Sequence, residues 1–248
     1  MPGTSFDRVA DIYDETRGGQ RRGDSFAAAV APWLLGPRVV ELGIGTGTIA
    51  TGLRGHGLDV VGVDLSEAML RKAVDRIGPR VAIADVDSLP VSDDSVDTAL
   101  FVWVLQLVDD PAASLREAAR IVRTGGRVVA LLARADDHPD DEIAQVLSGL
   151  APVRRRGHGA DPDLVDAQRG LELLHHGYTP WDEFPDTVAD QLAQIEGRQY
   201  SSLFDLDDET WTRVVVPVLD ELRAFSEPER IRTRRNRHPI AVWTVAAH

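Results

Sequence analysis

The chain contains no cysteine, which excludes disulfide bonds and zinc sites built on thiolates. It also lacks an apolar run long enough to cross a bilayer, and its first residues do not combine a basic segment with an apolar stretch, as a secretory leader would. No internal repeat or low-complexity segment is present. With 248 residues, 43% of them hydrophobic and 27% charged, the composition predicts one globular cytoplasmic domain with an appended cap.

Positive charge is scarce as well, because the formal net charge is −13 and Lys72 is the only lysine. An acidic chain repels phosphate backbones, so we expect no nucleic acid as a partner, and the lack of long apolar runs argues against a membrane. The arginines form two clusters, at 154–156 and within 230–237, which we interpret as solvated turns.

The most informative segment is VVELGIGTGT, residues 39–48, in which an apolar run ends in Glu41 and is followed by Gly43, Gly45 and Gly47. This pattern predicts a strand, a tight turn with bare backbone, and a helix whose free N–H groups face a ligand. A dinucleotide fingerprint would have its third glycine where this chain has Thr48. Glu41 would repel a diphosphate but suits an ammonium group, so a ligand with an amino acid end fits better than NAD. A plain tight turn is the alternative.

Acidic residues also end the next two predicted strands. DVVGVD, residues 59–64, reads as a buried strand ending in Asp64, about 20 residues past the glycine turn, where a carboxylate typically accepts the hydroxyls of a ribose. Ser66 then caps a predicted helix that begins at Glu67. A third strand over 80–84 leads to Asp85, whose carboxylate suits the exocyclic amine of adenine. Any one of these acids could be a loop residue, but acids at three successive strand ends indicate a binding site.

Further segments extend this α/β pattern, with a strand from 95, a helix over 111–122 and a turn and strand over 123–132. With them the chain resembles the class I S-adenosylmethionine-dependent methyltransferases. ELGIGTGT resembles the first motif of that family, VVGVDLSEAML the second, ADVDSLPVSDDSVD the third, and IVRTGGRVV the segment before the fifth strand. The resemblance covers about residues 38–133 and is specific for cofactor and fold, but not for substrate.

The resemblance implies a Rossmann-like α/β fold with a seven-stranded sheet in the order 3-2-1-4-5-7-6, an antiparallel last strand, helices on both faces and a helical cap. We expect a single domain over residues 1–248. Its parts would be an N-terminal lid region at 1–30, a cofactor-binding core at 38–133, a substrate cap with the sixth strand at 134–238, and the last strand at 239–246.

The second half of the chain has its own periodicities. Helical spacing occurs at 142–150, 163–170, 185–195 and 207–225, and strand patterns occur at 171–178 and 240–245. Near the N-terminus, residues 6–17 resemble the first helix of the family, on which Tyr13 and Arg17 would share one face.

The implied cofactor is S-adenosyl-L-methionine, with S-adenosyl-L-homocysteine as product, and no metal is expected. Together, the motifs and the resemblance assign cofactor binding to Tyr13, Arg17, Glu41, Gly43, Gly45, Gly47, Asp64, Leu65, Met69, Asp85, Val86 and Phe101.

Candidates for acceptor contact begin with Trp103 and Gln106, which follow the fourth strand at the position nearest the transferred methyl in relatives. Tyr178, Trp181, Arg198 and Tyr200 are further candidates, and as a set they favour an aromatic pocket over a charged one. Many relatives carry a histidine pair where this chain has Leu105 and Gln106, so the usual general base cannot be carried over. We take His175 and His176 as candidate bases instead.

The sequence therefore predicts a methyltransferase, acting as a monomer or homodimer on a small molecule, with an aromatic or polyketide-like secondary metabolite favoured. One alternative is a methyltransferase for a tRNA base, a quinone precursor or a carboxylic acid. Another is a protein that binds the same cofactor without transferring a methyl group. A dehydrogenase is disfavoured by the missing third glycine. The acceptor atom, the substrate and the oligomeric state stay open.

Overall fold

A computed structural model of the chain describes residues 6–7, 9–132, 136–153 and 170–247. These residues fall into two compact units. The first unit contains the described residues up to 132, together with 170–179 and 238–247, and the second contains 136–153 and 180–237. The arginine cluster at 154–156 and all but the last residue of the helix predicted at 163–170 lie outside the described residues.

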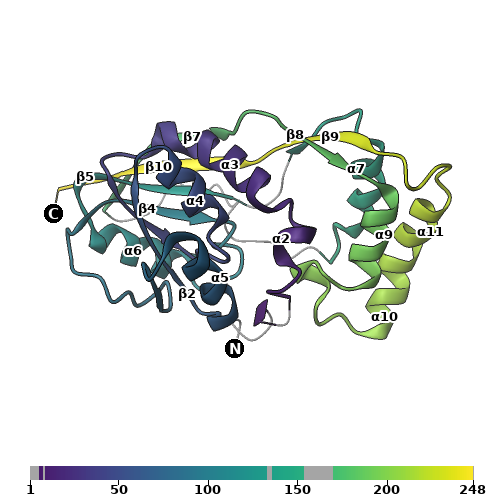
Figure 1. Cartoon of the computed structure of the whole chain (residues 1–248), viewed down its shortest axis with the longest axis horizontal. Helices are drawn as coiled ribbons and strands as arrows, with labels where there is room; N and C mark the ends of the chain where they lie inside the picture. Colours follow the sequence, from purple (N-terminus) through teal and green to yellow (C-terminus); the bar gives the residue numbers. More distant parts are fainter. Residues whose placement is uncertain (1–5, 8, 133–135, 154–169, 248) are drawn as a thin grey trace. The chain divides into compact units, whose positions relative to one another are not determined.

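The first unit is built on a seven-stranded sheet with the order β3-β2-β1-β4-β5-β10-β7. Figure 1 labels β2, β4, β5, β7 and β10 of this sheet. Neighbouring strands from β3 to β5 are parallel, whereas β10 is antiparallel to both β5 and β7. Because β7 and β10 are the sixth and seventh strands of this sheet along the chain, the predicted order is confirmed. The strands are β1 (Arg38–Leu42), β2 (Asp59–Asp64), β3 (Val81–Ile83), β4 (Val96–Val102), β5 (Val122–Leu131), β7 (Leu171–Tyr178) and β10 (Pro239–Val245).

Helices cover both faces of this sheet and close a hydrophobic core on each. Along β1, Val40 and Leu42 belong to the core that α6 covers, whereas Val39 belongs to the core beneath α3, α4 and α5. Burial of both faces explains why the parallel strands are nearly continuous apolar runs. The helices are α3 (Gly19–Val30), α4 (Thr48–Gly55), α5 (Glu67–Ile77) and α6 (Pro111–Ile121), with a short 3-10 helix at Ala31–Trp33.

The helix predicted over 6–17 is only partly present, because residues 9–12 form turns and α2 covers only Tyr13–Thr16. Three aspartates of this segment bind α5 or its N-cap. Asp7 accepts a hydrogen bond from the Ser66 hydroxyl, Asp11 pairs with Lys72, and Asp14 pairs with Arg76. The segment therefore lies along the α5 surface and does not form one continuous helix.

The second unit contains the predicted helices and, in addition, a three-stranded antiparallel sheet, β6-β9-β8, that the sequence analysis missed. The arginine-rich segment interpreted as a solvated turn is in fact the central strand β9. The strands are β6 (Asp136–Asp137), β8 (Asp182–Asp186) and β9 (Arg232–Arg237). The helices are α7 (Glu142–Leu147), α9 (Val188–Glu196), α10 (Asp208–Thr210), a π-helical turn at Trp211–Val215, α11 (Val216–Arg223), and 3-10 helices at Ser148–Leu150 and Ser201–Leu203. Within the described residues, no helix of either unit is long and apolar enough to span a membrane.

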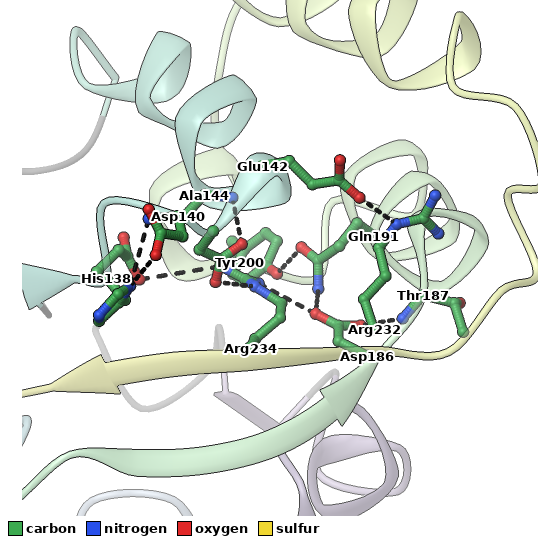
Figure 2. Close-up of polar contacts among 12 residues, drawn as sticks. His138, Asp140, Glu142, Ala144, Asp186, Thr187, Gln191, Tyr200, Arg232 and Arg234 are labelled. Atoms are coloured by element: carbon green, nitrogen blue, oxygen red, sulfur yellow. Dashed lines mark hydrogen bonds and ion pairs between the residues drawn. The ribbon is translucent and has the colours of Figure 1, made fainter.

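Arg234 explains why a strand so rich in arginine folds. Its side chain is only 8% exposed and donates to Asp141 at 2.8 Å and to Asp186 at 3.0 Å. Figure 2 shows this contact with Asp186, which also accepts a hydrogen bond from Gln191, whose amide oxygen accepts from the Tyr200 hydroxyl. The buried charges thus join β9 to α7 and α9.

Replacing Arg234 should destabilise the second unit selectively. Arg234→Met would leave two buried carboxylates without their cation, a loss that typically costs about 3–5 kcal/mol. Arg235→Met is the matched control, because the adjacent side chain is 48% exposed and its pair with Glu183 lies at the surface, where such pairs contribute about 1 kcal/mol or less. Hydrogen exchange of the α9 amides measures both effects, and equal protection in the two variants would contradict this role.

Candidate functional site

The ends of β1, β2 and β4 meet at the carboxyl edge of the sheet in the first unit. Leu42, the last residue of β1, pairs with Val63 on one side and with Phe101 on the other. The residues that follow each strand therefore emerge beside one another. Ligands of open parallel sheets bind outside this edge.

The glycine turn after β1 has the left-handed backbone that the sequence predicted. Gly43 has φ +76°, and a Cβ there would lie 2.3 Å from a methyl of Val104, so the position cannot carry a side chain. Gly45 has φ +57°, and a Cβ there would meet nothing within 4 Å. Gly47 follows with φ +79° as the N-cap of α4. The turn thus packs tightly at Gly43 and leaves open space beside Gly45.

Asp64 ties this turn to the loop after β2. One carboxylate oxygen accepts from the Gly45 amide at 2.9 Å, and the other accepts from the Ser66 amide at 2.8 Å. Burial raises the pKa of Asp64, and these amides partly offset the shift. The carboxylate is therefore held in a fixed orientation at the position where a ribose was predicted.

Glu41 is a buried acid that lacks a full set of partners. Its residue is 2% exposed, and its Oε2 has no hydrogen-bond partner among the described residues. Burial, together with the nearby charge of Asp64, raises the pKa of Glu41 to about 8. A cation at this end of β1 would supply the missing partner, so the acid fits the ammonium group proposed from the sequence.

The other residues predicted to bind cofactor lie in different environments. Leu65 is 44% exposed and Asp85 is exposed, whereas Met69 and Val86 are buried. Phe101 has no exposed surface and belongs to the core that α6 covers.

The N-terminal segment reaches the glycine turn through a residue that the sequence analysis did not single out. Asp14 accepts a hydrogen bond from the Thr46 hydroxyl at 2.6 Å and pairs with Arg76. Tyr13 packs edge-on to Phe6, and the Arg17 guanidinium lies 5.9 Å from the Tyr13 ring centre. Asp7, Asp11 and Asp14 follow one another at the spacing of one helix face. This spacing was the signal in the sequence that the N-terminal segment packs against another part of the chain.

The acceptor-contact candidates divide between the two units. Trp103, Gln106 and Tyr178 belong to the first unit, where Gln106 donates to the Trp103 carbonyl and Tyr178 pairs with Pro239 at the carboxyl edge. Trp181, Arg198 and Tyr200 belong to the second unit. There Arg198 stacks on Trp211 and donates to the carbonyls of Leu203 and Leu206, Trp181 lies under Arg237, and Tyr200 joins the network of Figure 2.

The structure does not bring His175 or His176 to the end of β4. Both lie on β7, the edge strand, which β10 and β5 separate from β4. With strands about 4.8 Å apart, the backbones of β7 and β4 are about 14 Å apart. His175 instead stacks on Trp33 with ring centres 4.2 Å apart, and His176 is exposed. This placement argues against either histidine as the base.

Another histidine, His238, lies beside Trp103 and was missed by the sequence analysis. It is 5% exposed, and its Nδ1 accepts from the Trp103 indole at 3.1 Å. Burial, together with the nearby Arg22 cation, lowers the pKa of His238 to about 3, so the ring is neutral near pH 7. No sequence signal marked it, because the contact joins residues 135 positions apart.

Comparison with known proteins finds a matching family model and several sequence relatives. A family model described as "Methyltransferase domain" matches residues 40–130. A demethylmenaquinone methyltransferase of Roseiflexus castenholzii is 32% identical over 77% of this chain and 80% of that protein. A malonyl-[acyl-carrier protein] O-methyltransferase of Pectobacterium atrosepticum is 30% identical over 75% of this chain and 73% of that protein. A demethylmenaquinone methyltransferase of Clavibacter sepedonicus is 36% identical, but the match spans only 62% of this chain and 61% of that protein.

Solved structures share the fold at lower sequence identity. A SAM-dependent methyltransferase from Thermotoga maritima superposes with a TM-score of 0.59 and 22% identity, and the match covers 100% of both chains. The [4+2]-cyclase SpnF superposes with a TM-score of 0.62 and 17% identity over 99% of this chain and 96% of that chain. These likenesses support the sheet topology described above.

In the absence of ligand, Glu41→Gln should be more stable to unfolding than the wild type, and this difference should grow as the pH rises. The raised pKa means that the folded state binds this proton more tightly than the unfolded state between about pH 4.5 and 8, so Glu41 lowers stability as pH rises through that window. Since one pKa unit corresponds to about 1.4 kcal/mol, the gain in Glu41→Gln should be on the order of a few kcal/mol above pH 8 and near zero at pH 4. Urea unfolding from pH 4 to 9 measures it. Exposed Glu67→Gln is the control, and parallel curves for Glu41→Gln and wild type would contradict the burial argument.

Proposed function

The chain belongs to the class I S-adenosylmethionine-dependent methyltransferases, and we propose that it transfers a methyl group from this cofactor to a small-molecule acceptor. The observation that carries the proposal is the combination of Glu41, Gly45 and Asp64 at one edge of the sheet. Gly45 has open space where a Cβ would be, Glu41 is a buried acid with an unpartnered oxygen among the described residues, and the Asp64 carboxylate is held by two backbone amides.

These residues match the parts of the cofactor by their chemistry. Glu41 would hold the ammonium of the methionine moiety, and Asp64 would accept hydrogen bonds from the ribose hydroxyls. Bare backbone at Gly45 lets the ligand approach the turn. Asp85, at the end of β3, would meet the adenine amine. Tyr13 and Arg17 stay proposed contacts from the segment that docks on this turn through Asp14.

The bound cofactor supplies a methyl group already activated by its positively charged sulfur. The protein therefore has to orient the acceptor and exclude water, and orientation alone contributes about 7–11 kcal/mol in well-aligned model reactions. Trp103, which follows β4, offers a half-buried indole for this purpose. We place it first among the acceptor contacts, with Gln106 and Tyr178 from the same edge of the sheet.

For the acceptor we propose a small aromatic or polyketide-like metabolite. The names of the relatives support two neighbouring classes, quinone precursors and carboxylates, and these stay alternatives. The fold shared with a [4+2]-cyclase keeps a third alternative, a role without methyl transfer. Formation of S-adenosylhomocysteine, assayed against a panel of phenols, quinols and carboxylic acids, discriminates among them. A chain that binds the cofactor but methylates none of these classes would favour the third alternative.

Asp64→Ala should weaken binding of S-adenosylhomocysteine. The variant loses one or two hydrogen bonds to a charged group, each contributing about 1.5–3 kcal/mol, so the dissociation constant should rise about tenfold or more. Asp59→Ala is the matched control, because Asp59 begins the same strand and pairs with Arg80 at the surface. Titration calorimetry measures both, and unchanged affinity in Asp64→Ala would overturn the assignment of Asp64.

The alternative of a tRNA acceptor can be tested by measuring RNA binding in solution. With a net charge of −13, the chain should not bind tRNA at physiological salt, and any binding at low salt should fall steeply as salt rises. Filter binding of tRNA across a salt series measures this. Tight binding that resists salt would replace the small-molecule proposal with an RNA substrate.

A further inference from the structure

His238, Trp103 and Arg22 form a cluster at the carboxyl edge of the first unit. The Trp103 indole N–H donates to His238 Nδ1, and the Arg22 guanidinium lies 4.3 Å from the Trp103 ring centre. Phe26, on the same helix as Arg22, packs edge-on to both rings. Trp103 follows β4 and His238 precedes β10, so both chain segments reach the cluster from the sheet.

The contact with Trp103 decides which nitrogen of His238 carries the proton. An indole N–H only donates, so Nδ1 offers its lone pair and the neutral ring carries its proton on Nε2. Nε2 is buried and has no hydrogen-bond partner among the described residues. Burial and the Arg22 cation lower the pKa of His238, whereas the Leu132 backbone carbonyl raises it. Apart from this influence of the Leu132 carbonyl, His238 is thus a buried N–H donor without a hydrogen-bonded acceptor in the described part of the chain.

Backbone strain and a second unpartnered atom lie at the same place. Trp103 has φ +54°, a left-handed conformation that side chains rarely adopt and that clusters at functional sites. Gln106, whose amide donates to the Trp103 carbonyl, has a buried Oε1 without a hydrogen-bond partner in the described part of the chain. Both Trp103 and Gln106 are only half-buried, so the cluster reaches the surface of the unit.

We propose that His238 donates a hydrogen bond from Nε2–H to an ionised oxygen of the methyl acceptor, which makes it a specificity residue for phenols, enols or carboxylic acids. The inference rests on the proposed methyl transfer and names the acceptor class. The nearby Arg22 cation adds to the preference for a negative oxygen over a neutral one. Because the proton stays on Nε2, His238 binds the acceptor as a donor and does not act as its general base.

The wild-type protein provides the first test. The full chain with ¹⁵N-labelled histidine is titrated with 4-nitrophenolate, 4-nitrobenzoate and neutral nitrobenzene, in the presence and absence of S-adenosylhomocysteine. We expect one histidine to show a protonated Nε2 and an unprotonated Nδ1 near pH 7, and its Nε2–H resonance to move with at least one anionic probe. A resonance that moves with neither anion would overturn the proposal.

Paired variants then separate the donor from the packing of the ring. His238→Asn keeps an acceptor near Nδ1 and removes the donor, whereas His238→Gln places an amide N–H near Nε2. Equilibrium dialysis gives the affinity for each anion relative to nitrobenzene, and this ratio should fall about tenfold in His238→Asn and recover in His238→Gln. His56→Asn, the same substitution at an exposed histidine, should leave the ratio unchanged.

The outcomes distinguish this inference from the function on which it rests. A wild-type chain that does not bind S-adenosylhomocysteine would contradict the proposed methyl transfer, whatever the anions do. Normal cofactor binding with equal affinity for anionic and neutral probes, or no binding of any probe at millimolar concentration, would overturn the role of His238 alone. A preference for 4-nitrophenolate over 4-nitrobenzoate would assign phenols or enols, and the reverse would assign carboxylic acids.

Discussion

Parallel pairing of β1 with β2 on one side and β4 on the other is the constraint on which the site depends. Since all three strands run in one direction, the glycine turn, Asp64 and Trp103 emerge at one edge, although they are far apart in sequence. Burial of both faces under α3, α4, α5 and α6 holds the strands in that register. The sheet thereby fixes the positions of buried polar groups, such as Glu41, that lack a full set of hydrogen bonds among the described residues.

Buried polar groups serve different ends in the two units. In the second unit, Arg234 is compensated by two aspartates, and the network holds a small sheet against its helices. At the carboxyl edge of the first unit, Glu41, Gln106 and His238 each keep an atom without a hydrogen-bond partner among the described residues. Such atoms cost stability unless a ligand or water satisfies them. Gln106 and His238 each share a hydrogen bond with Trp103, whose φ is +54°, and unpartnered atoms next to a strained residue are typical of a binding site.

The N-terminal segment links the cofactor site to α5 through charge. Asp7, Asp11 and Asp14 bind Ser66, Lys72 and Arg76, and Asp14 also binds Thr46 of the glycine turn. The only lysine of the chain therefore takes part in docking this segment. Since most of these pairs are partly exposed, their strength depends on salt, whereas the contacts of Asp64 with two backbone amides are partly buried and less sensitive to it.

The sequence by itself determined the glycine turn and the acids at the strand ends, because these follow from local patterns: apolar runs, alternating glycines, and an acid after each strand. The sheet order came from the family resemblance that these motifs carry, and the structure confirms it. The sequence also predicted Ser66 as the N-cap of α5. Only the tertiary structure decided the rest. Arg232–Arg237 reads as a solvated turn until Asp141 and Asp186, distant in sequence, neutralise Arg234. His238 was undetectable for the same reason, since its contact with Trp103 exists only once β10 lies beside β5, and that pairing depends on the whole fold.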